Sequence, residues 1–68
     1  MAGWQKVYRS EQPYKAEMVK DILENYGLSP IILNKKESAL QIGFCEVLVM
    51  SDQVLQALKI IEDDIQLE

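Results

Sequence analysis

Apolar residues recur at helical spacing in the segment between Pro13 and Tyr26. Ala16, Val19, Ile22, Leu23 and Tyr26 recur at this spacing, with Met18 at the margin and charged residues filling the opposite arc. This period predicts an amphipathic helix over 13–26 that buries one face. Pro13 is tolerated in the first helical turn. The chain should leave this helix at the glycine that follows Tyr26, where a left-handed cap is common.

A second helical period occupies the last part of the chain, residues 51–66. Its apolar stripe is Val54, Ala57, Leu58, Ile61 and Ile65. Ile60 falls off that stripe, and either Ser51 or Asp52 is a suitable N-terminal cap.

Three other segments have the character of strands. Residues 4–9 and 44–50 show the side-chain period of two that is typical of a strand. Residues 31–34 open with a short β-branched run. In the segment 44–50, alternation puts Cys45, Val47 and Val49 on one face. The order strand, helix, strand, strand, helix describes a split βαβ sandwich that lacks its last strand.

Handedness then fixes the arrangement of these elements. The first two strands are joined by a right-handed crossover, and the strand 44–50 lies between them. We therefore predict a single α+β domain over residues 1–68, with a three-stranded antiparallel or mixed sheet and both helices on one face. Val7 and one or two of the residues 31–33 should join the inward set, and alternation puts Gln5 and Arg9 on the same face as Val7.

Four apolar side chains are expected on the outward face of the sheet: Trp4, Tyr8, Leu48 and Met50. This face is more apolar than solvent-facing sheet should be, and exposed aromatic residues are enriched at interfaces. We therefore predict an interface at these four residues. The outward positions offer Lys6 and Glu46 as polar groups.

The stretch from Asn34 to Gly43 is long for a tight hairpin and is predicted to be either an ordered excursion or a mobile loop. It begins with polar residues that are candidates for binding an anionic ligand or a partner carboxylate: Asn34, Lys35, Lys36 and Ser38. Loops frequently carry function, which makes this set a candidate binding site.

No constellation in the sequence points to catalysis, a cofactor or a metal ion. The chain has no His, and its lone Cys45 lies in an alternating strand where a small core residue is the favoured interpretation. Carboxylates at positions 17, 21 and 24 share one arc with Lys20, as on a solvated helix face. We therefore predict no catalytic, cofactor-binding or metal-binding residues.

The charge and the hydropathy exclude several partners. Eleven acidic and seven basic residues give a formal net charge of −4, which disfavours nucleic acid. No apolar run approaches the ~20 residues that span a bilayer, and the N-terminus lacks a signal-peptide core. We expect a cytoplasmic protein that binds neither nucleic acid nor membrane.

Three parts of the sequence resemble a known family. These are the opening Trp4-Gln5-Lys6-Val7-Tyr8, the helix 16–24 followed by Tyr26-Gly27-Leu28, and the strand Glu46-Val47-Leu48-Val49 before a helix that contains Ala57. Together they resemble a small prokaryotic family described as putative signal transducing proteins. The stretch 33–38 is similar to members from Bacteroidetes.

The resemblance implies a ferredoxin-like plait, because that family is grouped by fold with the nitrogen-regulatory PII proteins, and it suggests a regulatory role. The sequence departs from PII proteins by lacking a fourth strand and their long nucleotide-contacting loops. That departure argues against nucleotide binding.

We expect a non-catalytic regulatory or protein-interaction module. The alternative is a small-molecule sensor or a minor enzyme that uses the concavity of a dimer. We also predict a homodimer, because a domain of this size buries only about 60% of its unfolded surface and an unpaired edge strand is seldom left bare. The dimer would form through the outward sheet face or through the edge of the first strand.

Overall fold

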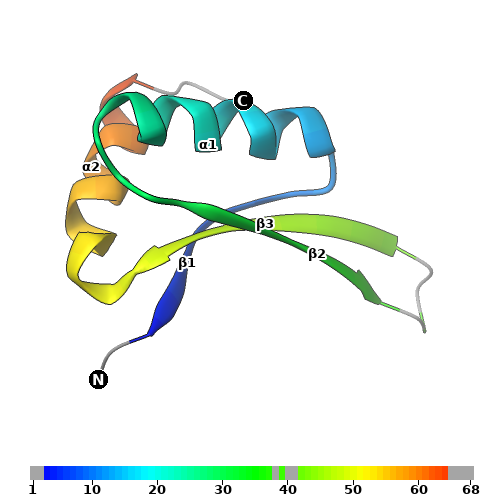
Figure 1. Ribbon diagram of the computed structural model, residues 1–68. Helices are drawn as coiled ribbons and strands as arrows, with labels where there is room; N and C mark the ends of the chain where they lie inside the picture. The colour runs from blue at the N-terminus through cyan, green and yellow to red at the C-terminus, as the bar shows by residue number, and fades with distance from the viewer. Residues whose placement is uncertain (1–2, 38, 40–41, 65–68) are drawn as a thin grey trace.

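The computed structural model describes residues 3–37, 39 and 42–64. The elements are β1 (Trp4–Ser10), α1 (Pro13–Asn25), β2 (Ile31–Glu37), β3 (Ile42–Met50), a 3-10 turn (Ser51–Gln53) and α2 (Val54–Asp64). Figure 1 shows α1 lying over one side of the sheet and α2 standing at one end of both layers. The predicted α+β class, with its β-α-β-β-α order, three strands and two helices, is confirmed.

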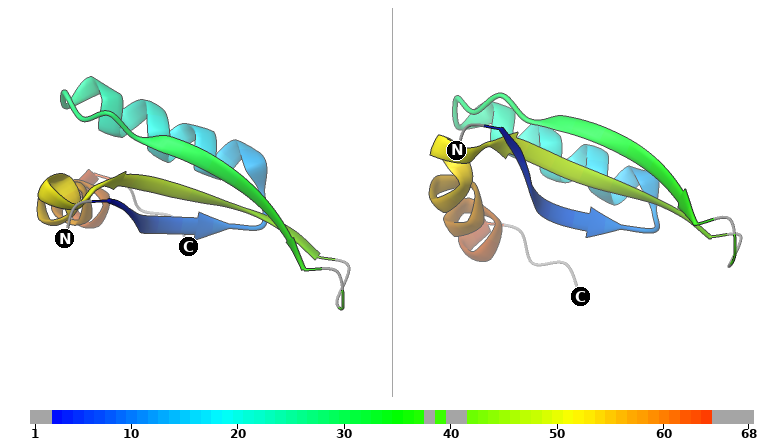
Figure 2. Two further views of the ribbon diagram at one scale, coloured as in Figure 1. Left: turned by 60° about the horizontal axis from the view of Figure 1, so that its bottom comes forward. Right: turned by 90° about the horizontal axis from the view of Figure 1, so that it is seen from below.

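The central strand of the sheet is β3. It pairs with β1 on one side and β2 on the other, both antiparallel, so the strand order is β1-β3-β2. This is the predicted order, and it leaves β1 at an edge. Figure 2 shows the β2–β3 hairpin extending past the end of α1.

The core lies between the inner face of the sheet and the two helices. Its buried members are Ala16, Val19, Leu23, Leu28, Cys45, Val47, Val49, Ala57 and Ile60. The inward prediction for Cys45, Val47 and Val49 is therefore confirmed. On β2 the inward residue is Ile32, which faces Val47 across the strand pair.

The C-terminus of α1 is closed by two backbone hydrogen bonds. The N–H of Gly27 donates to the carbonyl of Glu24, and the N–H of Leu28 donates to that of Leu23. Gly27 has a φ of 90°, the left-handed conformation expected at this position of a Schellman motif. Leu28 and Leu23 are both buried in the core, so the cap also directs the chain into β2.

Both strands of the hairpin extend farther into the stretch from Asn34 to Gly43 than predicted, and positions 38, 40 and 41 lie outside the described residues. Residues Asn34–Glu37 continue β2, and Ile42 and Gly43 begin β3. Pairing with the long central strand outweighs the weak β propensity of Asn34, Lys35 and Lys36, which face Cys45, Phe44 and Gly43 in the register.

A register shift in β1 corrects the predicted orientation of Tyr8. The pairing with β3 slips between Lys6 and Tyr8, which leaves Val7 as the extra residue of a β-bulge. After the bulge Tyr8 faces Val47 and packs against the core, whereas regular alternation placed it outward. The bulge also turns Arg9 to the outward face, opposite Glu46.

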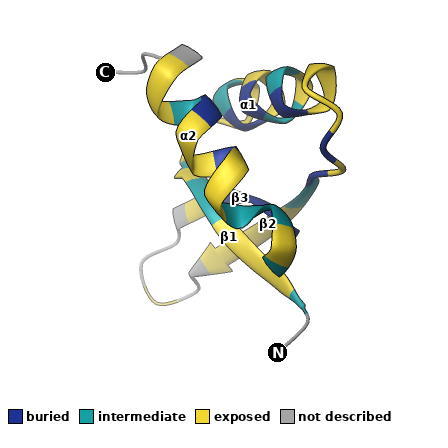
Figure 3. Ribbon diagram, turned by 90° about the vertical axis from the view of Figure 1, so that its left-hand side faces the viewer, coloured by how far each residue is buried: buried dark blue, intermediate teal, exposed yellow. Residues whose placement is uncertain are grey.

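The buried stripe of α2 differs from the prediction by a rotation of the helix. Ile60 is buried with Ala57, and Leu58 is exposed. In Figure 3 most of the outward side of α2 is coloured as exposed. Apolar residues occupy most of this helix, so the sequence period alone did not determine which side is buried. Ile65, the last residue of the predicted stripe, lies outside the described residues.

Truncation of the inner face should destabilise the domain. Val47 has no exposed surface, and we expect Val47→Ala to lower the free energy of unfolding by about 1–3 kcal/mol through lost burial and an unfilled cavity. Leu55→Ala is the control, because this side chain is 84% exposed and its loss should change stability by about 0.5 kcal/mol or less. Urea melts measure both, and equal effects would contradict the assigned core.

The bulge can be tested with two aromatic-to-serine changes in the same strand. We expect Tyr8→Ser to cost on the order of 2 kcal/mol because Tyr8 packs against the core. Trp4→Ser should cost about 1 kcal/mol or less, because Trp4 is 46% exposed. Without the bulge both residues would lie on the outward face, and similar losses in thermal melts would rule out the shifted register.

Candidate functional site

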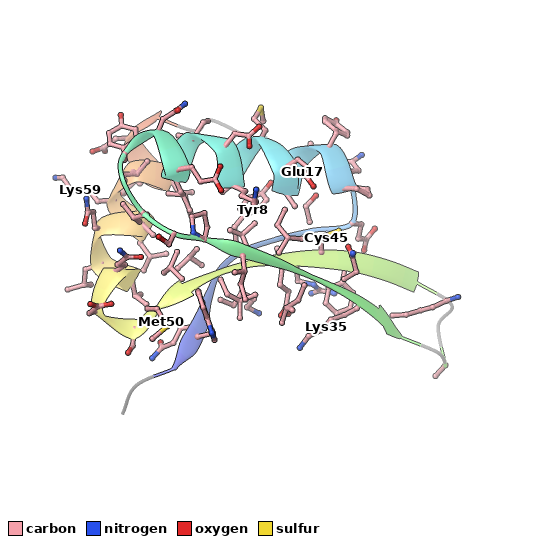
Figure 4. All side chains as sticks on the ribbon, viewed as in Figure 1. Tyr8, Glu17, Lys35, Cys45, Met50 and Lys59 are labelled. Carbon is pink, nitrogen blue, oxygen red and sulfur yellow. The ribbon has the colours of Figure 1, made fainter. Side chains whose placement is uncertain are left out.

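The candidate site is the outward face of the sheet, which we call the open face. It is formed by the outward positions of β3, which alternate with Cys45, Val47 and Val49, and by the residues that pair with those positions. Its described side chains are those of Trp4, Lys6, Arg9, Ile31, Leu33, Lys35, Phe44, Glu46, Leu48 and Met50. Ile42 and Glu37 share this face by strand register. Figure 2, right, looks onto this face, with α1 behind the strands. Figure 4 shows Lys35 and Met50 on this side of the sheet, and Tyr8 and Cys45 on the side of α1.

Glu46 lies at the centre of the open face and gathers two lysines. The Nζ atom of Lys35 lies 3.4 Å from its Oε1, and the Nζ atom of Lys6 lies 3.9 Å from its Oε2. The Glu46 side chain is only 12% exposed, whereas each lysine side chain is about half exposed. One carboxylate thus holds a cation from each edge strand on the face, with ammonium protons left for other acceptors.

Arg9 supplies a third cation to the open face. Its guanidinium carbon lies 4.1 Å from the centroid of the Phe44 ring, a cation–π contact. Among the described side chains, the open face therefore carries Lys6, Arg9 and Lys35 against Glu46 alone.

Apolar side chains complete the open face. Trp4 and Leu33 are substantially exposed, on β1 and β2 respectively. Leu48 lies outward in the middle of β3 but is only 8% exposed, between its cross-strand neighbours Lys6 and Ile31. Long side chains on the edge strands shield apolar surface in the centre.

The interface residues predicted from the sequence are thus divided. Trp4, Leu48 and Met50 lie on the open face, whereas Tyr8 lies on the inner face. Alternation found Lys6 and Glu46 on the outward side, but it missed Arg9 because the bulge changes the phase of β1 after Lys6.

The predicted loop residues are not one cluster. Lys35 lies on the open face beside Phe44, while Asn34 and Lys36 alternate to the opposite face. Ser38 lies outside the described residues. Lys35 was named as a candidate, but its place in a strand beside Glu46 was not foreseen.

Cys45 is held in the core by a hydrogen bond. Its thiol donates to the Oδ1 atom of Asn34 over 3.0 Å, and the residue is buried. An amide oxygen can accept this hydrogen bond, but it is too weak a base to remove the thiol proton and activate a nucleophile. Asn34 is itself exposed, so the interaction lies at the margin of the core, between neighbouring residues of β2 and β3.

The carboxylates of α1 form a charged surface around Lys20. The Nζ atom of Lys20 lies 3.2 Å from Glu24, and the hydrogen bond and charge of Glu24 raise the pKa of the lysine, with smaller contributions from Glu17 and Asp21. Across the described residues, no group of three or more His, Cys, Asp or Glu side chains is arranged to hold a metal ion.

A shallow hollow lies between the C-terminal end of α1 and α2. Its volume is about 220 Å³, and its lining consists of Tyr26, Gln56, Lys59, Ile60 and Asp63. Clefts that enclose small molecules usually measure about 300–1,000 Å³, so this hollow is small for that purpose. None of the helices in the described part of the chain is long and apolar enough to cross a bilayer.

Comparison with known proteins agrees with the resemblance seen in the sequence. No curated protein and no solved structure matches the chain significantly. A family model described as putative prokaryotic signal transducing protein matches residues 4–64. This match spans β1 to the end of α2 and therefore includes the whole of the open face. The chain belongs to this family of putative prokaryotic signal transducing proteins.

Proposed function

We propose that this domain is a non-catalytic regulatory module that acts by binding another protein through the open face of its sheet. The observation that carries the proposal is the composition of that face. It combines exposed apolar side chains, such as Trp4 and Leu33, with half-exposed cations held by a nearly buried carboxylate. Protein interfaces combine apolar anchors, especially aromatic ones, with polar groups in this way.

The chemistry of the other candidate groups supports a binding role over an enzymatic one. The chain has no His, and the Cys45 thiol is buried against an amide oxygen. General acid–base and nucleophilic mechanisms need a titratable group within reach of a nucleophile in a cleft. Glu46 is the central titratable group of the open face, and its carboxylate is paired with two lysines.

The predicted homodimer stays a prediction. In the described part of the chain, nothing pairs with the outer edge of β1, so this edge is available for a second strand. The bulge at Val7 interrupts that edge near its middle, and bulges are one device by which proteins discourage edge pairing.

Site-specific photocrosslinking in a prokaryote that encodes the protein tests the proposed function. We expect a photoreactive phenylalanine analogue at Leu33, on the open face, to crosslink to a specific protein. The same analogue at Tyr14 is the matched control, because Tyr14 is also a large exposed residue but lies on α1. It should give no such product.

Two outcomes would contradict the proposal. A specific product from Tyr14 with none from Leu33 would place the partner on the helical side. The absence of a protein product from either position would remove the binding function itself. Circular dichroism of both variants checks that the fold is retained.

A further inference from the structure

We infer that the occupant of the open face is an acidic protein segment that carries apolar side chains, rather than a second copy of this chain or a nucleic acid. This inference deepens the proposed function and rests on it.

Charge is distributed unevenly over the molecule. The chain has 7 basic and 11 acidic residues, yet three of the basic side chains lie on the open face beside one described carboxylate. By strand register Glu37, opposite Ile42, also falls on this face, so four basic and nine acidic residues lie elsewhere in the sequence. A domain that is acidic overall presents a cationic sheet face, and opposite charge favours a partner with carboxylates.

The cations of the open face are preorganised. Glu46 holds the lysines of both edge strands near the centre of the face, at 3.4 and 3.9 Å, and Arg9 rests on the Phe44 ring. Side chains that are already positioned lose less conformational entropy when they bind. A guanidinium or ammonium with free protons is a strong donor to a carboxylate.

The same cations disfavour a face-to-face dimer. A two-fold axis would bring the open face against itself, so that the three cations of each copy would face a surface that is itself cationic and whose described carboxylate is Glu46. Like charges brought together at an interface cost binding free energy. The open-face route of the predicted homodimer is therefore disfavoured, whereas the repulsion does not bear on pairing through the β1 edge.

Aromatic placement and charge weigh against nucleic acid. Single strands are bound by stacking bases on exposed aromatic rings along a continuous positive groove. On the open face the ring of Phe44 is covered by Arg9, which leaves Trp4 as the exposed aromatic side chain among those described. A carboxylate occupies the centre of the face, and the net charge of −4 opposes a polyanion as dense as nucleic acid.

A peptide titration tests the inference. Trp4 is the single tryptophan and lies on the open face, so its fluorescence reports binding directly. The probe is a short peptide with Asp and Glu interleaved with Leu and Phe. The comparison probes are the same peptide with Lys in place of each acid, the same peptide with Ser in place of Leu and Phe, and an oligothymidylate.

We expect the acidic apolar peptide to bind most tightly and to lose affinity as salt is added. NMR amide shifts should concentrate on the open-face positions of the strands. The double variant Arg9→Gln with Lys35→Gln should weaken binding about tenfold or more, because hydrogen bonds to charged groups are lost. The control pair Lys15→Gln with Lys59→Gln removes the same charge from the two helices and should leave affinity unchanged.

A third variant tests the sign of the effect. Glu46→Gln keeps the size of the side chain and an oxygen that accepts hydrogen bonds from the lysines, but it removes the central negative charge, so the acidic peptide should bind more tightly. Weaker or unchanged binding would contradict the inferred role of charge.

The remaining outcomes each overturn the inference. These are tighter binding of the lysine peptide or of the oligothymidylate, equal binding of the peptide without Leu and Phe, or light scattering that shows a dimer abolished by the Arg9 and Lys35 double variant. Failure of the peptide titration with the Leu33 crosslink retained would refute the acidic partner alone. Loss of that crosslink would refute the proposed function.

Discussion

The structure depends on one constraint: the two helices of the described residues cover only one face of the sheet. α1 lies across the inner face, while α2 stands at the end and contributes Ala57 and Ile60 to the same core. The other face must therefore remain stable in water although Leu48 lies in its central strand. It does so by lateral cover from neighbouring side chains, which leaves Leu48 only 8% exposed without a second layer.

The same constraint explains the ionic arrangement around Glu46. A carboxylate on the middle strand of an uncovered sheet would lose hydration to its neighbours, and the lysines of the edge strands compensate for that loss. Half-exposed ion pairs of this kind contribute little to stability. These ion pairs instead fix the positions of the lysine side chains on the outward face of the sheet.

Much of the fold followed from local pattern, because period and handedness act over short distances. Alternation identified Cys45, Val47 and Val49 as inward, and the crossover rule put their strand in the middle. In α2 the many apolar positions left the buried side undetermined, so that Leu58 was placed inward and Ile60 outward. In the sheet, the errors arose where pairing between strands decides the position of a side chain. Val7 and Tyr8 are both apolar, so nothing local marks the extra residue of the bulge. Lys35 has a loop-like composition and is held in β2 by β3.

The candidate site was foreseen in part for the same reason. Lys6 precedes the bulge in β1 and Glu46 lies on β3, and both residues are on the predicted face of the sheet. Arg9 follows the bulge and lies on the face opposite to the predicted one. The ion pairs and the contact of Arg9 with Phe44 join residues of three different strands. A pattern that runs along one strand cannot show such contacts.

The β2–β3 hairpin reaches beyond α1 (Figures 1 and 2), so its two parts differ in how strongly core packing restricts their residues. Near Val47 and Val49 a substitution is felt by the whole core, because every neighbour is packed. At Lys35 and Phe44, farther along the hairpin, side chains have solvent on one side and are absent from the core cluster. Under the proposed function, changes there would alter what the domain binds while the fold stays as it is. The hairpin would then allow this small scaffold to acquire new partners one substitution at a time.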